Sequence, residues 1–232
     1  MTRVNTPPQN QGSGARLYEG EGTLIAQREE AIEGFFPATA MPDADWWEAL
    51  WPEPKQVLAT LGIRADMEVI DLCCGDGLFT APLALMSRRV VGIDIDPNML
   101  ATTRAKMTAS GATNYELIEG DAYDVAQLVH RPVDFVLMAN TFHGVPDKLR
   151  FSRAVAAILK PDGRFAVVNW HRRPREETTV LGEPRGPKTD MRMTPADVVA
   201  TVTPAGLSLV NIVKLPPYHY GAIFEKPLRM TQ

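Results

Sequence analysis

The fold is decided by the stretch MEVIDLCCGDGLFTAPLALMSRRVVGIDID, residues 67–96. Its first six residues form an apolar run that predicts a buried strand, and residues 90–95 predict a second strand. Between the two strands, residues 78–87 favour a helix. The turn that leads from the first strand into this helix is rich in glycine, with Gly75 and Gly77. Strand, helix and strand at this spacing predict neighbouring parallel strands joined through a helix.

The same alternation continues on the C-terminal side of this stretch. The patterns predict helices at residues 98–111, 149–159 and 194–206, and strands at residues 115–121, 133–140 and 164–170. The segments LSLVNIVKL and YHYGAIFEK then predict a closing pair of strands. Strands that alternate with helices indicate an α/β fold whose parallel sheet is covered on both faces.

The residues before this stretch have a different composition. Residues 1–16 are polar and predict a flexible tail. Residues 17–62 predict a helical lid or cap, with a short helix near 23–33 and a second helix that carries tryptophans such as Trp46. Residues 63–232 make up the α/β domain.

A long polar segment, residues 171–193, follows the last predicted parallel strand and is rich in proline and arginine. Loops of this length without structure of their own are uncommon in compact domains, so the segment predicts a functional insertion. Its basic side chains, among them Arg185 and Arg192, either bind an anionic group of a substrate or form a solvated loop.

The overall composition excludes several classes of protein. Lys plus Arg number 24 and Asp plus Glu number 28, so the net charge of −4 argues against a nucleic-acid-coating protein. No run of about 18 apolar residues predicts a membrane span, and the N-terminal residues lack the apolar core of a secretory signal. Two neighbouring cysteines, Cys73 and Cys74, build neither a disulfide framework nor a zinc site. We therefore expect a reduced, cytoplasmic protein with no metal, no nucleic-acid partner and no membrane partner; its oligomeric state stays open.

Acidic residues mark the ends of three successive predicted strands, at Asp71, Asp94 and Asp121. Ligands of open α/β sheets bind beyond the carboxyl ends of the strands, and an acidic side chain there accepts hydrogen bonds from both hydroxyls of a ribose. Three such carboxylates on one edge favour a nucleoside pocket over chance solvation. The glycines of the first turn let the backbone approach a ligand closely.

A dinucleotide such as NAD is the rival ligand for this edge. Its fingerprint requires a third glycine three residues after the second, and Thr80 stands there instead. Asp76 also places a negative charge in the turn, which would repel a diphosphate and would suit a cationic sulfonium ligand.

Four segments in this order, DLCCGDG, GIDIDPNML, EGDA and LKPDGRF, resemble those of the class I S-adenosylmethionine-dependent methyltransferases. The resemblance covers the chain from Met67 onward. It implies a Rossmann-like doubly wound sheet, mostly parallel with an antiparallel C-terminal strand pair, and S-adenosylmethionine as the cofactor. The cofactor-binding residues that it implies are Asp71, Cys73, Gly75, Gly77, Asp94, Ile95, Met99, Asp121, Ala122 and Asn140.

Within that set the resemblance implies distinct contacts. The turn after the first strand wraps the methionine part of the cofactor, with Cys73 in place of the family's first glycine. Asp94 binds the ribose, Asp121 bonds the adenine amino group, and Asn140 begins a segment whose carbonyls face the cofactor amine and the substrate.

The expected function is transfer of a methyl group to a small-molecule acceptor by in-line displacement, mainly through positioning and desolvation. Candidate catalytic residues are His143 and His171, and candidate substrate-binding residues are Phe35, Trp46 and Tyr220. Two alternatives stay open. One is a catalytically inactive S-adenosylmethionine-binding sensor or partner subunit, and the other is a methyltransferase that acts on a macromolecule. The segment Asn-Thr-Phe-His from residue 140 disfavours planar amide targets, because enzymes acting on them often carry Asn-Pro-Pro-Tyr there.

Overall fold

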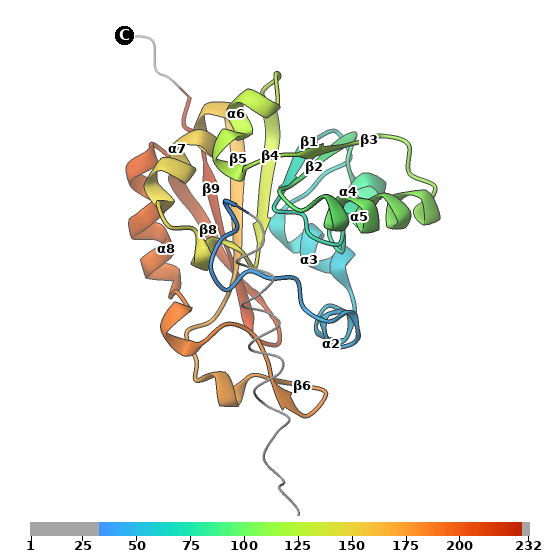
Figure 1. Cartoon of the computed structure of the whole chain (residues 1–232). Coiled ribbons are helices and arrows are strands. Elements are labelled where there is room, and N and C mark those ends of the chain that lie inside the picture. The colour runs from blue at the N-terminus through green and yellow to red at the C-terminus, as the bar shows by residue number, and fades with distance from the viewer. Residues whose placement is uncertain (1–32, 229–232) are drawn as a thin grey trace, which may run out of the picture.

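The computed structural model describes residues 33–228, and its centre is a seven-stranded sheet with the strand order β3-β2-β1-β4-β5-β9-β8 (Figure 1). The expected tail at 1–16 and the expected helix near 23–33 lie outside the described residues, apart from the last residue of that helix. The strands of the sheet are β1 (Glu68–Leu72), β2 (Arg89–Asp94), β3 (Tyr115–Glu119), β4 (Val133–Ala139), β5 (Leu159–Trp170), β8 (Ser208–Leu215) and β9 (His219–Glu225).

The direction of the strands confirms the expected fold class. Strands β1 to β5 pair in parallel, whereas β9 runs antiparallel to both β5 and β8. The strand order changes direction at β1, which has β2 on one side and β4 on the other. This is the switch point at which open α/β sheets bind ligands, beyond the carboxyl ends of the strands.

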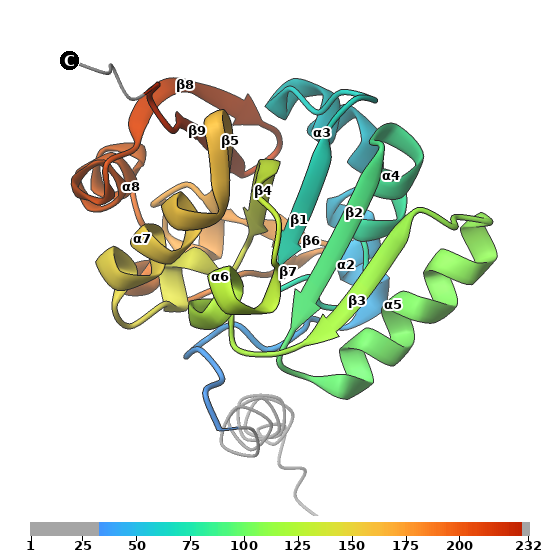
Figure 2. The ribbon, with the colours of Figure 1, turned by 90° about the horizontal axis from the view of Figure 1, so that it is seen from above.

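Helices cover both faces of the sheet (Figure 2). The α-helices are α2 (Ala44–Leu50), α3 (Pro54–Leu61), α4 (Thr80–Met86), α5 (Pro97–Ser110), α6 (Val125–Leu128), α7 (Lys148–Ile158) and α8 (Pro195–Val202). Side chains from α2 to α5 pack on one face and side chains from α6 to α8 on the other. Left-handed Gly62 and Gly111 end α3 and α5, a position that glycine commonly takes because it lacks a Cβ.

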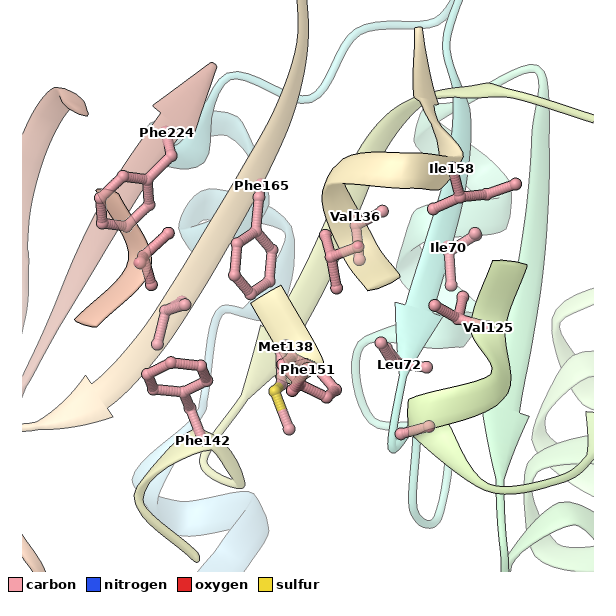
Figure 3. Packing of buried hydrophobic residues seen from close by; sticks show 14 of the residues in the cluster. Ile70, Leu72, Val125, Val136, Met138, Phe142, Phe151, Ile158, Phe165 and Phe224 are labelled. Carbon is pink, nitrogen blue, oxygen red and sulfur yellow. The ribbon is translucent and has the colours of Figure 1, made fainter. Parts of the chain in front are cut away.

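The core beneath α6 to α8 is rich in aromatic rings (Figure 3). The ring of Phe151 on α7 lies 6.0 Å from that of Phe142 and 6.3 Å from that of Phe165, centroid to centroid. Full burial of one such side chain stabilises the folded state by roughly 1.5–3 kcal/mol. This packing fixes α7 against β4 and β5, and so fixes the loops that follow these strands.

The segment between β5 and α8 is more ordered than a solvated loop. It contains a short hairpin of β6 (Thr179–Val180) and β7 (Glu183–Pro184), and α2 contacts β6. Neither this hairpin nor α6 is predicted by the sequence patterns. No helix among residues 33–228 is long and apolar enough to cross a membrane.

Candidate functional site

A hydrogen bond joins the turn after β1 to the end of β2. The backbone N–H of Gly75 donates to Oδ2 of Asp94 at 2.8 Å, and the N–H of Asp96 donates to Oδ1 of the same carboxylate at 3.0 Å. The carbonyl of Gly75 in turn accepts a hydrogen bond from the hydroxyl of Thr103 on α5 at 2.8 Å. The turn is therefore held from both sides, and its shape depends on the second strand and the following helix.

Both glycines of this turn adopt a positive φ, and neighbouring atoms leave no room for a side chain at either position. Gly77 has φ +82°, and a Cβ there would lie 3.0 Å from the backbone Cα of Thr103. Gly75 has φ +54°, and its Cβ would lie 2.9 Å from the sulfur of Met41. The preceding Cys73 adopts φ +60°, a conformation that non-glycine residues rarely take. The turn is thus packed closely against Met41 and Thr103, and neither glycine leaves room for a side chain.

Burial disfavours the charged forms of the groups beside the turn. Asp71 at the end of β1 accepts a hydrogen bond from the hydroxyl of Thr80 at 2.6 Å, and burial raises the pKa of its carboxyl to about 7. Burial, reinforced by neighbouring carboxylates, raises the pKa of the Cys73 and Cys74 thiols well above the ordinary value. The cysteines are therefore protonated, and act here as small packing groups rather than as nucleophiles.

Asp76 is paired with a cation, contrary to the expectation that its charge would repel a diphosphate. Oδ2 of Asp76 accepts a hydrogen bond from Nζ of Lys106 at 2.5 Å, and the ion pair is largely buried. Because an ammonium group neutralises this carboxylate, Asp76 does not discriminate between a diphosphate and a sulfonium ion. The partner lies 30 residues away on α5, so the sequence offers no local sign of it.

The third predicted carboxylate, Asp121, lies at the tip of β3. Its Oδ1 accepts a hydrogen bond from the N–H of Tyr123 at 2.8 Å and so caps the short helix that begins with the buried Ala122. A Cβ on Gly34 would lie 3.4 Å from Oδ2 of Asp121 and 3.0 Å from Cδ1 of Ile95. Asp121 and Ile95 thus face a common space, and Gly34 lies over it.

Residues 33–43, here called the strap, cross the carboxyl edge of the sheet. Besides Gly34 at the tips of β2 and β3, Met41 lies against Gly75. Nε2 of His143 is 3.0 Å from the carbonyl oxygen of Ala38, and a Cβ on Gly144 would collide with the carbonyl of Pro37. The strap is therefore fitted to the loops that follow β1, β2, β3 and β4.

His143 fastens this strap and is not free in a pocket. Its side chain is buried, and burial lowers its pKa below the ordinary 6.5, so the ring is neutral at neutral pH. A neutral ring donates through Nε2–H to the carbonyl of Ala38. In this structure Nε2 of His143 is therefore engaged by the strap.

Asn140, directly after β4, is unusual in two respects. It has φ +60°, and its N–H donates to the carbonyl of Val168 on β5 at 2.8 Å. Its side-chain nitrogen and oxygen are buried and lack a hydrogen-bond partner among the described residues. Buried amides nearly always have partners, so the unpartnered amide makes Asn140 a candidate ligand-binding residue.

The remaining candidates are spread over several environments. Met99 is half-buried in the first turn of α5, close in sequence to Ile95. His171 is half-buried after β5, where its ring lies 5.1 Å from that of Tyr220. Phe35 is half-buried, while its neighbour Phe36 is buried with its ring 5.6 Å from that of Tyr123.

Tyr220 and Trp46 differ in what they offer to a ligand. Tyr220 is fully buried in the core, and its hydroxyl donates to the carbonyl of Met193 at 3.0 Å. The ring of Tyr220 is therefore covered, and its hydroxyl already has a partner within the protein. Trp46 is buried on α2, where the guanidinium of Arg185 lies 5.1 Å from the centre of its ring.

Several further polar groups in this region are buried and unpartnered, and sequence reasoning did not select them. They are the ring nitrogens of Trp47, Trp51 and His219, the side-chain amide of Asn169, and Nε of Arg185. The signal available in the sequence was weak, since His219 sits in an alternating YHY segment that reads as ordinary strand packing. No group of three metal-ligating side chains was found among residues 33–228.

Comparison with known proteins places this geometry in context. A family model described as a methyltransferase domain matches residues 69–163. A demethylmenaquinone methyltransferase of Staphylococcus aureus is 34% identical over 112 residues, which cover 47% of this chain and 45% of that protein. One of Shouchella clausii is 29% identical over 118 residues, covering 48% of each. The chain spans about half the length of the curated relatives it matches.

Solved structures with the same fold align over most of the chain. An S-adenosylmethionine-dependent methyltransferase from Aquifex aeolicus matches with a TM-score of 0.67 and 22% identity, covering 88% of this chain and 97% of that one. The N-methyltransferase NodS from Bradyrhizobium japonicum, in complex with S-adenosylhomocysteine, matches with a TM-score of 0.61 and 16% identity, covering 87% and 96%. At such low identity these likenesses establish the fold.

Proposed function

We propose that this chain, which carries a class I S-adenosylmethionine-dependent methyltransferase domain, transfers a methyl group from S-adenosylmethionine to a small-molecule acceptor. When bound, S-adenosylmethionine supplies a methyl group that is already activated by a positively charged sulfur. The protein is then required to bind both molecules, to align them and to exclude water.

The residues at the edge of the sheet fit this cofactor. A carboxylate has about four lone-pair sites, and Asp94 uses two of them for the N–H groups of Gly75 and Asp96. The backbone of Ile95 also contributes a hydrogen bond to this carboxyl, and the acceptor capacity that remains serves the hydroxyls of a ribose. Asp94 is thus the residue that holds the sugar, while Ile95 and Asp121 flank the base.

The single observation that carries the proposal is the unpartnered side-chain amide of Asn140 at the end of β4, beside the strand switch point. An amide offers both a donor and an acceptor, which suits the ammonium and carboxylate groups of the methionine part of the cofactor. The unsatisfied group costs roughly 1–3 kcal/mol when nothing bonds to it. Cofactor binding removes that cost, and so stabilises the bound state relative to the free protein.

The strap supplies the exclusion of water. His143 fixes it at Ala38, and Met41 covers the open side of Gly75. The catalytic contribution of these residues is to position the strap and to keep the site dry. No general base is assigned to His143, because its Nε2–H is committed to a backbone carbonyl.

A small molecule is the acceptor that the comparisons favour. The relatives that match about half of this chain are named demethylmenaquinone methyltransferases, and demethylmenaquinone is a small molecule. The net charge of −4 also disfavours a nucleic-acid acceptor.

Methyl-labelled S-adenosylmethionine tests the proposal directly. The purified protein is incubated with the labelled cofactor and, in separate reactions, with a pooled extract of small metabolites, total protein or total RNA. We expect label to enter the small-metabolite fraction. Label in protein or RNA instead would show that the acceptor is a macromolecule and not a small molecule. Cofactor binding with no labelled product in any fraction would favour the sensor or partner-subunit alternative.

A further inference from the structure

Four buried rings meet at the carboxyl edge of the sheet, on the face covered by α2. Trp47 lies on α2, Trp51 caps its C-terminus, Trp170 ends β5 and His219 begins β9. The centre of the His219 ring lies 4.4 Å from that of Trp51 and 4.2 Å from that of Trp170. We call these four side chains the aromatic cluster.

The aromatic cluster contains polar atoms that bond to nothing in the described part of the chain. They are Nε1 of Trp47, Nε1 of Trp51 and both ring nitrogens of His219. Burial, reinforced by the charge of Arg192 and by His171, holds the pKa of His219 well below the ordinary 6.5, so its ring is neutral. Three N–H donors and one ring acceptor are therefore available in an otherwise apolar place. An unsatisfied buried donor is costly, so several in one cluster point to a ligand that accepts hydrogen bonds.

A buried positive charge stands beside the aromatic cluster. The side chain of Arg192 is 2% exposed, and its guanidinium lies 5.1 Å from the centre of the Trp170 ring. Four of its five N–H donors bond to the carbonyls of Arg173, Arg185 and Pro187 and to the hydroxyl of Thr178.

That charge has no counter-ion in the described residues. Between residues 33 and 228, no carboxylate lies within ion-pair distance of the Arg192 guanidinium. At longer range the negative charge of Glu176 raises the pKa of Arg192, and the positive charge of Arg175 lowers it. Burial lowers the pKa of Arg192 to about 10, so the group remains charged at neutral pH. A buried charge without a partner is unfavourable, and an anion placed nearby would stabilise it.

Arg185 adds a second cation with a free donor. Its Nε is buried and has no hydrogen-bond partner among the described residues, and its guanidinium lies over Trp46. The loop that carries it is pressed onto Trp170, since a Cβ on Gly186 would lie 2.7 Å from that ring. Arg185 is therefore placed to donate to an anion held among the tryptophans.

The aromatic cluster adjoins the cofactor edge. Met41, whose sulfur lies against Gly75, packs against the hydrophobic core that contains the cluster. The ring of Trp51 lies 5.3 Å from that of Phe79, which follows the turn after β1. The N–H of Asn140 donates to the carbonyl of Val168, two residues before Trp170 on β5. A molecule bound among the rings would thus lie next to both the turn after β1 and the end of β4.

We propose that Trp47, Trp51, Trp170, His219, Arg185 and Arg192 form the acceptor-binding site, and that the acceptor is a planar aromatic carboxylate. This inference rests on the proposed function, because it names the substrate class of the same site. The rings provide flat surfaces for stacking, Arg185 donates to the carboxylate, and the charge of Arg192 offsets its negative charge. His219 is left to bond a further polar group of the acceptor.

Entry to the site requires α2 to move, because the four rings of the aromatic cluster are at least nine-tenths buried. The helix is suited to such movement. It has seven residues, and its first residue follows Asp43, whose side chain makes no capping hydrogen bond.

Tryptophan fluorescence tests this inference, because all four tryptophans of the chain lie in or beside the aromatic cluster. The full chain, saturated with S-adenosylhomocysteine, is titrated with 4-hydroxybenzoate. Two matched probes follow: 4-hydroxybenzamide, which lacks the charge, and 4-hydroxycyclohexanecarboxylate, which lacks the aromatic ring. We expect saturable binding of 4-hydroxybenzoate at least about tenfold tighter than that of either control. Equal binding of the amide or of the cyclohexane acid would overturn the assigned class.

Two variants locate the binding. Arg185→Gln should weaken 4-hydroxybenzoate binding by about tenfold or more, whereas Arg172→Gln, an exposed change in the same segment, should leave it unchanged. Calorimetry with S-adenosylhomocysteine on the same samples separates the two proposals. If the wild-type protein binds the cofactor but not 4-hydroxybenzoate, this inference alone is refuted. If the wild-type protein does not bind the cofactor, the proposed function is refuted.

Discussion

The carboxylate of Asp94 accepts a hydrogen bond from the backbone N–H of Gly75 at 2.8 Å, across 19 residues of sequence. One side chain thus fixes the shape of the turn after β1 and marks the end of β2. Under the proposed function its remaining acceptor capacity serves the hydroxyls of a ribose. The second strand and the first turn consequently form one binding unit.

Replacing Asp94 with asparagine should therefore weaken cofactor binding. Asp94→Asn keeps an oxygen that accepts from Gly75, but its NH₂ group replaces the oxygen that accepts from Asp96 and from a ribose hydroxyl. We therefore expect the affinity for S-adenosylhomocysteine to fall by more than about tenfold. Calorimetric titration measures the change. Asp96→Asn is the matched control, since Asp96 caps α5 through Asn98 and should tolerate the amide. An unchanged affinity in Asp94→Asn would remove Asp94 from the ribose site.

The two positive-φ glycines Gly77 and Gly111 should respond differently to alanine. Gly111→Ala meets no atom within 4 Å and bears the cost of the left-handed conformation alone, about 1 kcal/mol. Gly77→Ala adds a collision with the Cα of Thr103, so its loss of unfolding free energy should be larger, roughly 2–4 kcal/mol. Urea unfolding of both variants checks the order. Equal losses would mean that the turn relaxes without cost.

The buried carboxyl of Asp71 should make stability depend on pH. Its pKa is about 7 in the folded protein, against the ordinary 3.8 of an aspartate in the unfolded chain, so the folded protein binds this proton more tightly. The stabilisation is present below the unfolded pKa and is lost as the pH rises through about 7, a change on the order of a few kcal/mol. Asp71→Asn does not titrate and can still accept from Thr80.

As the pH rises from about 5 to about 8, the unfolding free energy of the asparagine variant should thus increase relative to that of the wild type. Urea unfolding of both proteins at the two pH values measures the difference. A difference that stays constant with pH would show that Asp71 is ionised throughout.

The strap should loosen when its tether to His143 is removed. His143→Phe keeps an aromatic side chain but cannot donate to the carbonyl of Ala38, so about 1 kcal/mol of local stability is lost. Hydrogen exchange of the amides in residues 35–43 should accelerate several-fold. His130→Phe, at an exposed position, serves as the control. Identical exchange in both variants would show that the contacts of Gly34 and Met41 hold the strap without His143.

Much of the fold follows from local features of the sequence. Apolar runs mark β1, β2 and β4, and Gly62 and Gly111 end their helices in the left-handed conformation that glycine favours. These features can be predicted from the sequence because each depends only on residues close to it in the chain. The antiparallel pairing of the last two strands followed from family resemblance instead, because apolar pattern alone does not fix strand direction.

Contacts between segments that are far apart in the chain could not be predicted from local sequence patterns. The neutralisation of Asp76 by Lys106 needs α5 to be placed against the first turn. The packing of His219 between Trp51 and Trp170 needs three elements that are far apart in the chain. Such relationships decide the electrostatics of the site, although the positions of its carboxylates were readable from the strand ends.

The most direct test of the account is a calorimetric titration of the wild-type chain with S-adenosylhomocysteine, repeated with Asp94→Asn. The account predicts one molecule bound per chain in the wild type and an affinity lower by more than about tenfold in the variant. An absence of binding at millimolar concentration in the wild type, or equal affinity in the two proteins, would contradict it.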